Sequence, residues 1–304
     1  DWPSFRGAGQ RFNTSLRFGL QRRDFNLQFT EPWFLGQKLA FSVSTYFRQM
    51  FFLSDRFDQQ NVGVSFGLRK PIGEHMYIEG TWTLQQVRID NIAPGSSPVI
   101  IGDAGSFFEN KFDLALVHDT RDSVFITRSG HKLEAGLMAA GGGDVEIYGA
   151  NFSGQQFIPL PFDGILSFWG EAAVVDNWGG TRVPMFERQF LGGANNLRGF
   201  DFREVGPKDA TGEPIGGNVS LFGSIEYTFP IIEKVRGALF YDVGSISGDL
   251  PAVVGDGDIN SNVGLGLRLF LPVGPIRVDY GIPVESDRFN DSSGRFQFNM
   301  GYQF

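Results

Sequence analysis

Few residues of this chain have the types and the spacing that chemistry at a site requires. The three histidines, His75, His118 and His131, lie far apart in the sequence, and none stands at a spacing that metal ligands use. The chain contains no Cys, which excludes disulfides and thiolate chemistry, and no G-x-S-x-G nucleophile element. We therefore expect no enzyme activity, no catalytic residues, no metal site and no cofactor.

One loop carries part of a calcium-binding pattern. Asp256, Asp258 and Asn260 follow the D-x-D-x-N start of such a loop, but the twelfth position, where a bidentate Glu is needed, holds Leu267. Because that ligand is missing, a solvated loop explains the segment better, and calcium binding stays an alternative.

Composition limits the elements that could position a site. The 304 residues include 32 Phe and 41 Gly, and aromatic residues make up 14% of a chain whose mean hydropathy is −0.12. No stretch approaches the roughly 18 consecutive apolar residues of a transmembrane helix, which excludes a helical membrane protein. The net charge of −8 argues against nucleic acid as a partner, because binding phosphates requires a basic surface. Alternating strands fit this composition better than a helical core.

Strand-like runs of about ten residues recur along the chain, separated by Gly, Asn, Asp and Pro. In the last run, 295–304, aromatic residues and Met alternate with Gln, Asn and Gly. A period of two with large apolar groups on one side means that one face meets an apolar medium. The runs 263–271 and 276–282 repeat the pattern, with Gly or charged residues on the other face. Such faces fit a soluble sandwich, where the apolar face meets a second sheet, or a membrane barrel, where it meets lipid.

Connection lengths favour the barrel. Tight turns such as 70–74, 160–164 and 271–275 alternate with long polar loops such as 91–105 and 248–260, which is the outer-membrane pattern. We predict an all-β fold, a transmembrane antiparallel β-barrel of sixteen strands that occupies residues 1–304 as a single domain. The expected strands span 8–19, 22–32, 37–51, 57–70, 75–90, 107–119, 131–140, 145–159, 164–177, two short strands within 184–206, 217–229, 235–247, 260–271, 275–284 and 295–304.

An ordered set of short motifs is spread over nearly the whole chain. The most specific is Leu197-Arg198-Gly199-Phe200, preceded by Gly192-Gly193 and followed by Val205-Gly206-Pro207. It resembles the V/I-R-G-F signature in the sixth extracellular loop of the BamA family of outer-membrane protein assembly factors. The supporting segments are Thr30-Glu31-Pro32-Trp33-Phe34, Asp119-Thr120-Arg121-Asp122 with Gly130 at a turn, and Phe296 to Gly301. The resemblance implies an integral β-barrel of a Gram-negative outer membrane.

The resemblance implies a role for Arg198. In BamA-like barrels this loop folds back into the lumen, where its Arg pairs with acids that project inward from neighbouring strands. Strand parity supplies two such acids, because the apolar faces of 221–229 and 235–243 leave Glu226 and Asp242 on the opposite face. Charge-assisted bonds would hold Arg198 between these two carboxylates. The expected lumen cluster is Arg198, Gly199, Phe200, Glu226 and Asp242; the alternative is that both acids only solvate a polar lumen.

The resemblance also implies a mechanism, since the family inserts other barrels into the membrane without nucleotide hydrolysis. An unpaired strand edge in lipid leaves its N–H and C=O groups unsatisfied, at several kcal/mol each. A barrel whose first and last strands pair poorly could lend its open edge to a client strand, which is β-augmentation. Gly301 could allow the last strand to bend and the seam to open, although it could equally make room for a lumen side chain. The candidate seam joins Ala8–Gly19 to Arg295–Phe304, with Phe12, Thr14, Leu16, Phe296, Phe298, Gly301 and Phe304 as its residues.

Partners follow from the same resemblance. We expect unfolded outer-membrane β-barrel clients, outer-membrane lipids, and accessory lipoproteins or other assembly-complex subunits, with no nucleic acid. The family carries periplasmic POTRA domains before the barrel and this chain contains none, so we expect them upstream. Two other functions stay open. One is a two-partner-type polypeptide secretion pore, which resembles this chain in the R-G-F loop, and the other is a passive porin; the segment 30–34 and the last strand favour the assembly factor.

Overall fold

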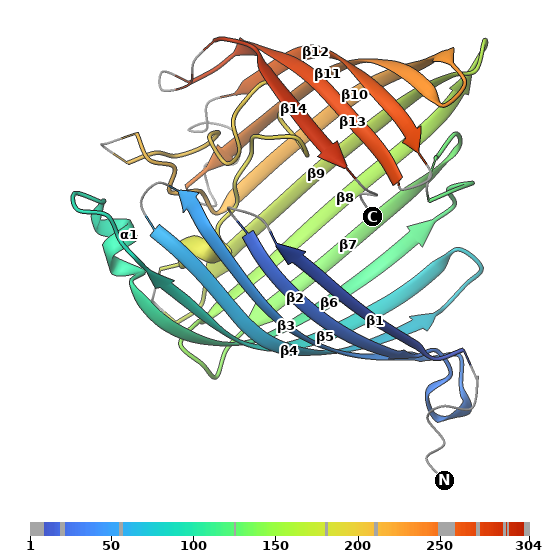
Figure 1. The fold of residues 1–304 in the computed structure, drawn as a ribbon. Coiled ribbons are helices and arrows are strands. Elements are labelled where there is room, and N and C mark those ends of the chain that lie inside the picture. Colours follow the sequence, from blue (N-terminus) through green and yellow to red (C-terminus); the bar gives the residue numbers. More distant parts are fainter. Residues whose placement is uncertain are drawn as a thin grey trace. The chain divides into compact units, whose positions relative to one another are not determined.

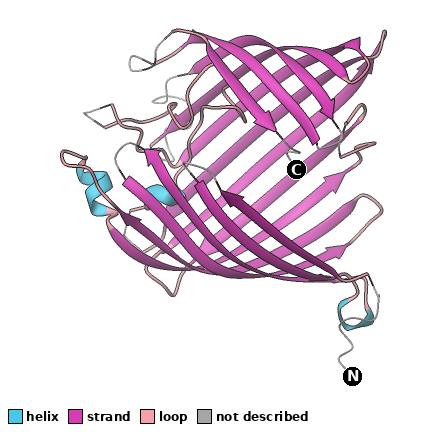
Figure 2. Ribbon diagram, in the orientation of Figure 1, coloured by secondary structure: helices cyan, strands magenta, loops and turns pink. Residues whose placement is uncertain are grey.

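A computed structural model gives the three-dimensional structure and describes residues 9–18, 22–54, 57–124, 126–179, 182–209, 212–248, 259–271, 274–287, 290 and 292–300. Strands make up most of it, and the helices are few and short (Figure 2). The predicted all-β antiparallel architecture is confirmed. Among these residues, no helix has both the length and the apolar character needed to cross a bilayer.

Fourteen strands follow one another along the described residues, and each is hydrogen-bonded to the next in sequence order (Figure 1). Sequence order equals sheet order because antiparallel neighbours need only short connections. The helical segments are η2 (Phe34–Gly36), α1 (Pro98–Gly102) and η3 (Met185–Glu187). The strands are β1 (Arg11–Phe18), β2 (Arg22–Glu31), β3 (Ala40–Ser54), β4 (Phe57–Pro71), β5 (Met76–Asp90), β6 (Gly105–Asp119), β7 (Gly130–Ala140), β8 (Ile147–Leu160), β9 (Gly164–Asn177), β10 (Val219–Ile232), β11 (Val235–Ser247), β12 (Asn260–Leu271), β13 (Gly274–Glu285) and β14 (Arg295–Met300).

Burial follows the period of two that the sequence predicts. In β12, Val263, Leu265 and Leu267 are 43–59% exposed, whereas Asn262 and Arg268 on the other face are at most 9% exposed. Because side chains of a strand alternate between its faces, one face of β12 is apolar and the other carries buried polar groups. An exposed apolar face of this kind is what contact with lipid requires.

The described residues form two compact units. The first unit consists of the described parts of Asp1–Val117, Gly136–Ala150 and Asp176–Phe186 and includes β1 to β5. In this unit Asp103, just after α1, accepts hydrogen bonds from Arg182 Nη2 at 2.7 Å and from Met185 N at 2.9 Å. The start of the long connection after β9 is therefore fixed to the end of α1.

The second unit holds the strands that carry the predicted cluster. It consists of the described parts of His118–Ala135, Asn151–Val175 and Glu187–Phe304, and its strands β10 to β14 pair in sequence order. In the register, Ser224 of β10 lies opposite Asp242 of β11, and Gly264 of β12 lies opposite Gly281 of β13. Residues 188–218, which we call the long loop, lead into β10.

The prediction of sixteen strands is not confirmed, because the two short strands expected within 184–206 are absent from that fully described segment. The segment forms η3 and two isolated bridges, Gln189 with Gly217 and Leu191 with Val205. Gly192 and Gly193 have φ angles of 109° and 104°, a conformation that ends an extended run. The calcium-like positions Asp256 and Asp258 lie outside the described residues, as do Gly301 and Phe304 of the expected seam.

Candidate functional site

The tip of the long loop is seated by a small apolar core. Leu197 and Phe200, which flank Arg198 and Gly199, are 0% and 2% exposed. Burying side chains of this size contributes about 1.5–3 kcal/mol each, so the two flanking residues hold the Arg-Gly pair in place. The core consists of Leu191, Leu197, Phe200 and Val205 of the loop with Phe222 of β10 and Ile246 of β11, and Trp169 packs against it.

Arg198 is held by carboxylates from three strands. Its Nε donates to Oδ2 of Asp242 in β11 at 2.9 Å, and its Nη2 donates to Oδ1 of the same residue at 2.7 Å. The two residues thus form a bidentate ion pair. Its Nη1 donates to Oε2 of Glu226 in β10 at 2.5 Å and lies 3.6 Å from Oδ2 of Asp279 in β13. The structure thus brings together Arg198, Glu226 and Asp242, as the sequence predicts.

Two further arginines extend the network. Arg268 Nη2 of β12 lies 2.7 Å from Glu226 Oε2, and its Nη1 lies 2.6 Å from Asp279 Oδ1. Arg277 Nε of β13 lies 3.3 Å from Asp279 Oδ2. Three guanidinium groups and three carboxylates balance in charge, which offsets much of the cost of burying them. We call Arg198, Glu226, Asp242, Arg268, Arg277 and Asp279 the arginine cluster.

Neutral groups complete the surroundings of Asp242 and Arg198. Ser224 Oγ donates to Asp242 Oδ1 at 2.7 Å, and Asn262 Nδ2 donates to Asp242 Oδ2 at 3.0 Å. The Arg198 guanidinium lies 3.5 Å from the centre of the Phe240 ring, within the range of a cation–π contact. Asp242 therefore has hydrogen-bond donors at both oxygens, as a buried carboxylate requires.

The Arg198–Asp242 pair is buried, and this decides what Arg198 can do. The side chains of Arg198 and Asp242 are 5% and 0% exposed. Burial opposes the charge of Arg198, but the carboxylates of Asp242, Glu226 and Asp279 outweigh it and raise the pKa of the guanidinium. A group that keeps its proton at every working pH cannot serve as a general acid or base, so Arg198 acts as a tie between the loop and the strands.

Two glycines allow the loop backbone to reach the sheet. A Cβ at Gly281 of β13 would lie 2.7 Å from both the Arg198 carbonyl carbon and the Gly199 nitrogen. A Cβ at Gly199 would lie 2.6 Å from the Asn262 Cβ. Real Cβ atoms are not found at such distances, so both positions need glycine for close backbone approach. This explains the Gly of the R-G-F motif and a Gly in the middle of β13.

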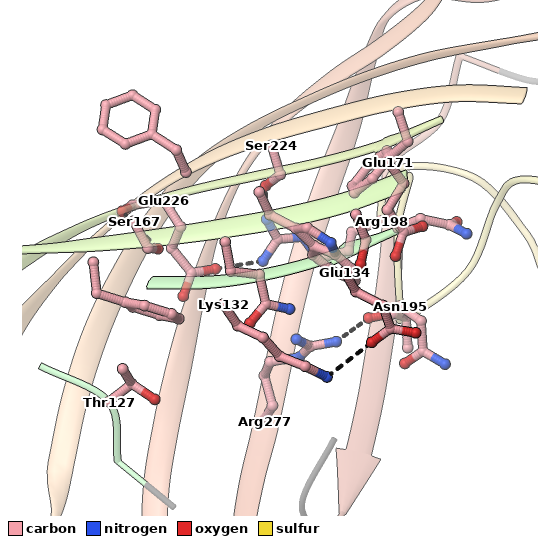
Figure 3. A pocket seen from close by; sticks show the side chains of 18 of the residues that line it. Thr127, Lys132, Glu134, Ser167, Glu171, Asn195, Arg198, Ser224, Glu226 and Arg277 are labelled. Carbon is pink, nitrogen blue, oxygen red and sulfur yellow. Dashed lines mark hydrogen bonds and ion pairs between the residues drawn. The ribbon is translucent and has the colours of Figure 1, made fainter. Parts of the chain in front are cut away.

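A cavity of about 710 Å³ in the second unit adjoins the cluster. Arg198, Glu226 and Arg277 line it together with Lys132 and Glu134 (Figure 3). Lys132 Nζ lies 3.3 Å from Glu134 Oε2. Charges of both signs line the cavity, so it has no evident preference for a ligand of one charge.

Half of the cluster was missing from the sequence prediction. The alternation in 263–271 and 276–282 already placed Arg268, Arg277 and Asp279 on the polar face, but parity alone does not say which inward charges meet. The register supplies that information, because Arg268 lies directly opposite Arg277 between β12 and β13. Two arginines in register need a shared acid, and Asp279 is within 3.3 Å of both.

The predicted seam residues lie on two strands. Phe12, Thr14 and Leu16 occupy alternate positions of β1, which pairs with β2. Phe296 and Phe298 occupy alternate positions of β14, which pairs with β13, and both are exposed. The remaining two, Gly301 and Phe304, are not among the described residues.

Two histidines that are distant in the sequence meet in the structure. His118 near the end of β6 and His131 at the start of β7 place Nδ1 and Nε2 2.9 Å apart. Thr120 Oγ1 lies 3.1 Å from His131 Nδ1. The strand pair, and not the sequence spacing, brings the imidazoles together. Across the described ranges no group of three or more His, Asp or Glu is arranged to hold a metal ion.

Comparison with known proteins places the chain in one family. A model described as the Omp85 superfamily domain matches residues 4–304. The outer membrane protein assembly factor BamA of Nitratidesulfovibrio vulgaris is 28% identical over 306 residues, which cover 98% of this chain and 38% of the relative. The sorting and assembly machinery component 50 homolog A of Xenopus laevis is 25% identical over 241 residues, 75% of this chain and 49% of the relative. The chain thus spans less than half the length of both relatives.

Solved structures show the same fold. BamA from Haemophilus ducreyi lacking POTRA domains 1–3 matches with a TM-score of 0.83 at 18% identity, over 96% of this chain and 64% of that one. CdiB from Escherichia coli matches with a TM-score of 0.61 at 16% identity, over 92% and 53% of the two chains. At these identities the likeness concerns the fold alone.

Proposed function

The chain belongs to the Omp85 superfamily, and from this premise we propose that it folds and inserts β-barrel proteins into the outer membrane. It is an integral β-barrel protein of the outer membrane, similar to BamA. The observation that carries the proposal is the 28% identity to a BamA assembly factor along 98% of this chain. The activity belongs to the whole protein, of which this chain is the part similar to the barrel.

We further propose that residues 1–304 close into one barrel and that the long loop lies in its lumen. The cluster supports this arrangement, because Arg198 reaches acids on β10, β11 and β13 from the loop. A loop that is bound to the strands through a buried charge would keep its position inside the barrel when other strands of the barrel move. Gly199 and Phe200 serve the tie by close approach and by apolar packing.

The proposed mechanism is exchange of strand edges at a seam between the first and last strands, without nucleotide hydrolysis. A client strand entering lipid must satisfy its N–H and C=O groups, and an open strand edge offers the partners. β14 pairs with β13 along its described positions, 295–300. Phe12, Thr14, Leu16, Phe296, Phe298, Gly301 and Phe304 are the proposed seam residues.

The proposed partners are unfolded outer-membrane barrel clients, outer-membrane lipids, and accessory lipoproteins or other subunits of an assembly complex. The relatives support subunits of this kind, since one is called an assembly factor and the other a sorting and assembly machinery component. No catalytic residue, metal or cofactor belongs to the proposal, because strand exchange is driven by burial and hydrogen bonding.

A second candidate is a two-partner-type polypeptide secretion pore. The R-G-F loop resembles those pores as well, and CdiB from Escherichia coli shares the fold. In that case an extended polypeptide would pass the lumen, and the long loop would have to move aside.

Depletion of the full-length protein distinguishes these functions. Outer-membrane proteins are quantified by mass spectrometry as the protein is depleted. A general loss of barrel proteins supports assembly, whereas loss of one secreted substrate supports the secretion pore. If neither changes, the assembly proposal is wrong, and passive solute uptake, as in a porin, is the function to measure.

A further inference from the structure

The polar face of β14 contacts the tip of the long loop at three alternate positions. Arg295 Nε lies 3.0 Å from Asp201 Oδ2, and Gln297 Nε2 donates to the Phe200 carbonyl oxygen at 2.9 Å. The third contact is Asn299 Nδ2, which donates to Asn195 Oδ1 at 2.8 Å. Because alternate residues share a strand face, all three bonds come from the same side of β14. We call these three contacts the β14 clamp.

The clamp and the arginine cluster differ in exposure. The side chains of Arg295 and Asp201 are 28% and 59% exposed, against 5% and 0% for Arg198 and Asp242. An exposed ion pair contributes little stability. Opening a buried ion pair costs more free energy, because each charge is left without a partner and away from water. The clamp can therefore open while the loop stays tied to β10 and β11.

The clamp attaches β14 to the buried tip of the loop. Gln297 binds the backbone of Phe200, whose side chain is buried in the apolar core. The backbone of Arg198 and Gly199 rests on Gly281 of β13, the neighbour of β14. The loop tip thus contacts the backbone of β13 and forms hydrogen bonds with side chains of β14.

We propose that Arg295, Gln297 and Asn299 are positioning residues that hold the last strand against the tied loop, and that the clamp must open when a client strand is inserted. The inference rests on the proposed assembly function. The last strand cannot present its edge to a client while three bonds fix its polar face to a loop that does not move.

A reversible covalent clamp tests this directly, because the 304 residues contain no Cys. The variant Asn195→Cys with Asn299→Cys is made in the full-length protein, with any other cysteine changed to Ser. The oxidised and reduced forms are reconstituted in vesicles of outer-membrane lipids, and insertion of a urea-unfolded barrel client is timed. We expect the oxidised form to insert the client about tenfold more slowly or worse, since the tie removes the open state, and reductant to restore the rate.

A matched control crosslinks two strands that stay paired in the proposed mechanism. Ile225 of β10 and Tyr241 of β11 are partners in the register, and both are exposed on the apolar face. Ile225→Cys with Tyr241→Cys should insert the client at the same rate in both redox states. Equal rates for oxidised and reduced Asn195→Cys/Asn299→Cys would overturn the clamp proposal. Failure of the reduced forms and the unmodified protein to insert any client would instead overturn the assembly function.

A charge exchange tests the same clamp without a crosslink. Asp201→Arg places two cations face to face and should open the clamp, which raises the insertion rate by about two- to fivefold, the range that an exposed ion pair allows. Asp201→Arg with Arg295→Asp restores an ion pair and should return the rate to that of the unmodified protein. An unchanged rate in the single variant would count against the proposal, because a merely structural role predicts no gain.

Discussion

Arg198 and Asp242 form a two-pronged ion pair, with Nε–Oδ2 at 2.9 Å and Nη2–Oδ1 at 2.7 Å, between a loop and a strand 44 residues further along the chain. Both side chains are buried, and Asp242 has two neutral donors as well. Such a pair is costly to break, because each charge is left without its partner away from water. The loop is therefore tied to the sheet by a buried charge.

Removing the tie should destabilise the fold. Arg198→Ala leaves the buried Asp242 carboxylate without its cation, although Glu226 keeps Arg268, and we expect a loss of about 3–5 kcal/mol in the free energy of unfolding. Arg88→Ala is the matched control, because Arg88 pairs with Asp90 at an exposed site, and its effect should stay within about 0.5 kcal/mol. Urea unfolding in lipid vesicles measures both. Equal losses for the two variants would contradict the assignment.

Gly281 should not tolerate a side chain. Gly281→Ala places a methyl group 2.7 Å from the Arg198 carbonyl carbon, so the loop tip must shift, at about 1–3 kcal/mol. Gly223→Ala is the control, since its Cβ would meet only Val243 Cγ1 at an ordinary 3.6 Å. Limited proteolysis should cut the long loop faster in Gly281→Ala than in Gly223→Ala. Identical digestion patterns would show that the loop does not rest on β13.

Arg268 and Asp279 should be energetically coupled. A double-mutant cycle with Arg268→Gln and Asp279→Asn should give a coupling energy of roughly 1–3 kcal/mol, because Nη1 and Oδ1 lie 2.6 Å apart and are shielded from water. The half-exposed pair Lys132–Glu134 provides the comparison cycle, for which we expect less than about 0.5 kcal/mol. Unfolding in urea supplies the seven free energies of the two cycles, which share the unmodified protein. If the two substitutions change the free energy of unfolding additively, Arg268 and Asp279 do not interact, and the pair does not belong to the cluster.

Acid should loosen the turn between β6 and β7. Slight burial works against the charge of Asp122, but backbone N–H groups of Arg128 and Ser129 donate to its carboxylate and keep its pKa below the ordinary value. A carboxyl whose folded pKa is lowered stabilises above its unfolded pKa of about 3.9, and this stabilisation is lost as pH falls through the folded pKa. Relative to intrinsic exchange at each pH, the amides of Arg128 and Ser129 should be protected near neutral pH and lose this protection in strong acid, and in Asp122→Ala they should lack it at both pH values. Equal protection in Asp122→Ala and the unmodified protein near neutral pH would be the opposite result.

The sequence predicted the parts of this fold that depend on local pattern. Alternation along 263–271 and 295–300 predicted those strands and their faces, and the alternation in 221–229 and 235–243 placed Glu226 and Asp242 on the face that Arg198 reaches. The choice of Arg198 itself came from a motif resemblance, because nothing in the local pattern says where a loop folds.

The other members of the arginine cluster and the loop contacts of β14 depend on strand register and on contacts between residues distant in the sequence, which a local pattern does not give. Asp279 joins the cluster because β12 and β13 place Arg268 opposite Arg277, and a period of two does not give that register. The contacts of β14 with Asp201 and Asn195 join residues about a hundred positions apart. The two short strands expected within 184–206 are absent because Gly192 and Gly193, with positive φ angles, interrupt an extended run there.

Client insertion by the purified protein tests the assembly function most directly. The full-length protein is reconstituted in vesicles of outer-membrane lipids without nucleotide, and an unfolded barrel client is added. Folding is followed by protease protection and by the heat-sensitive gel mobility of closed barrels. The proposed function predicts that the client folds into the vesicles several times faster than into protein-free vesicles of the same lipids. Equal rates in the two kinds of vesicle would contradict it.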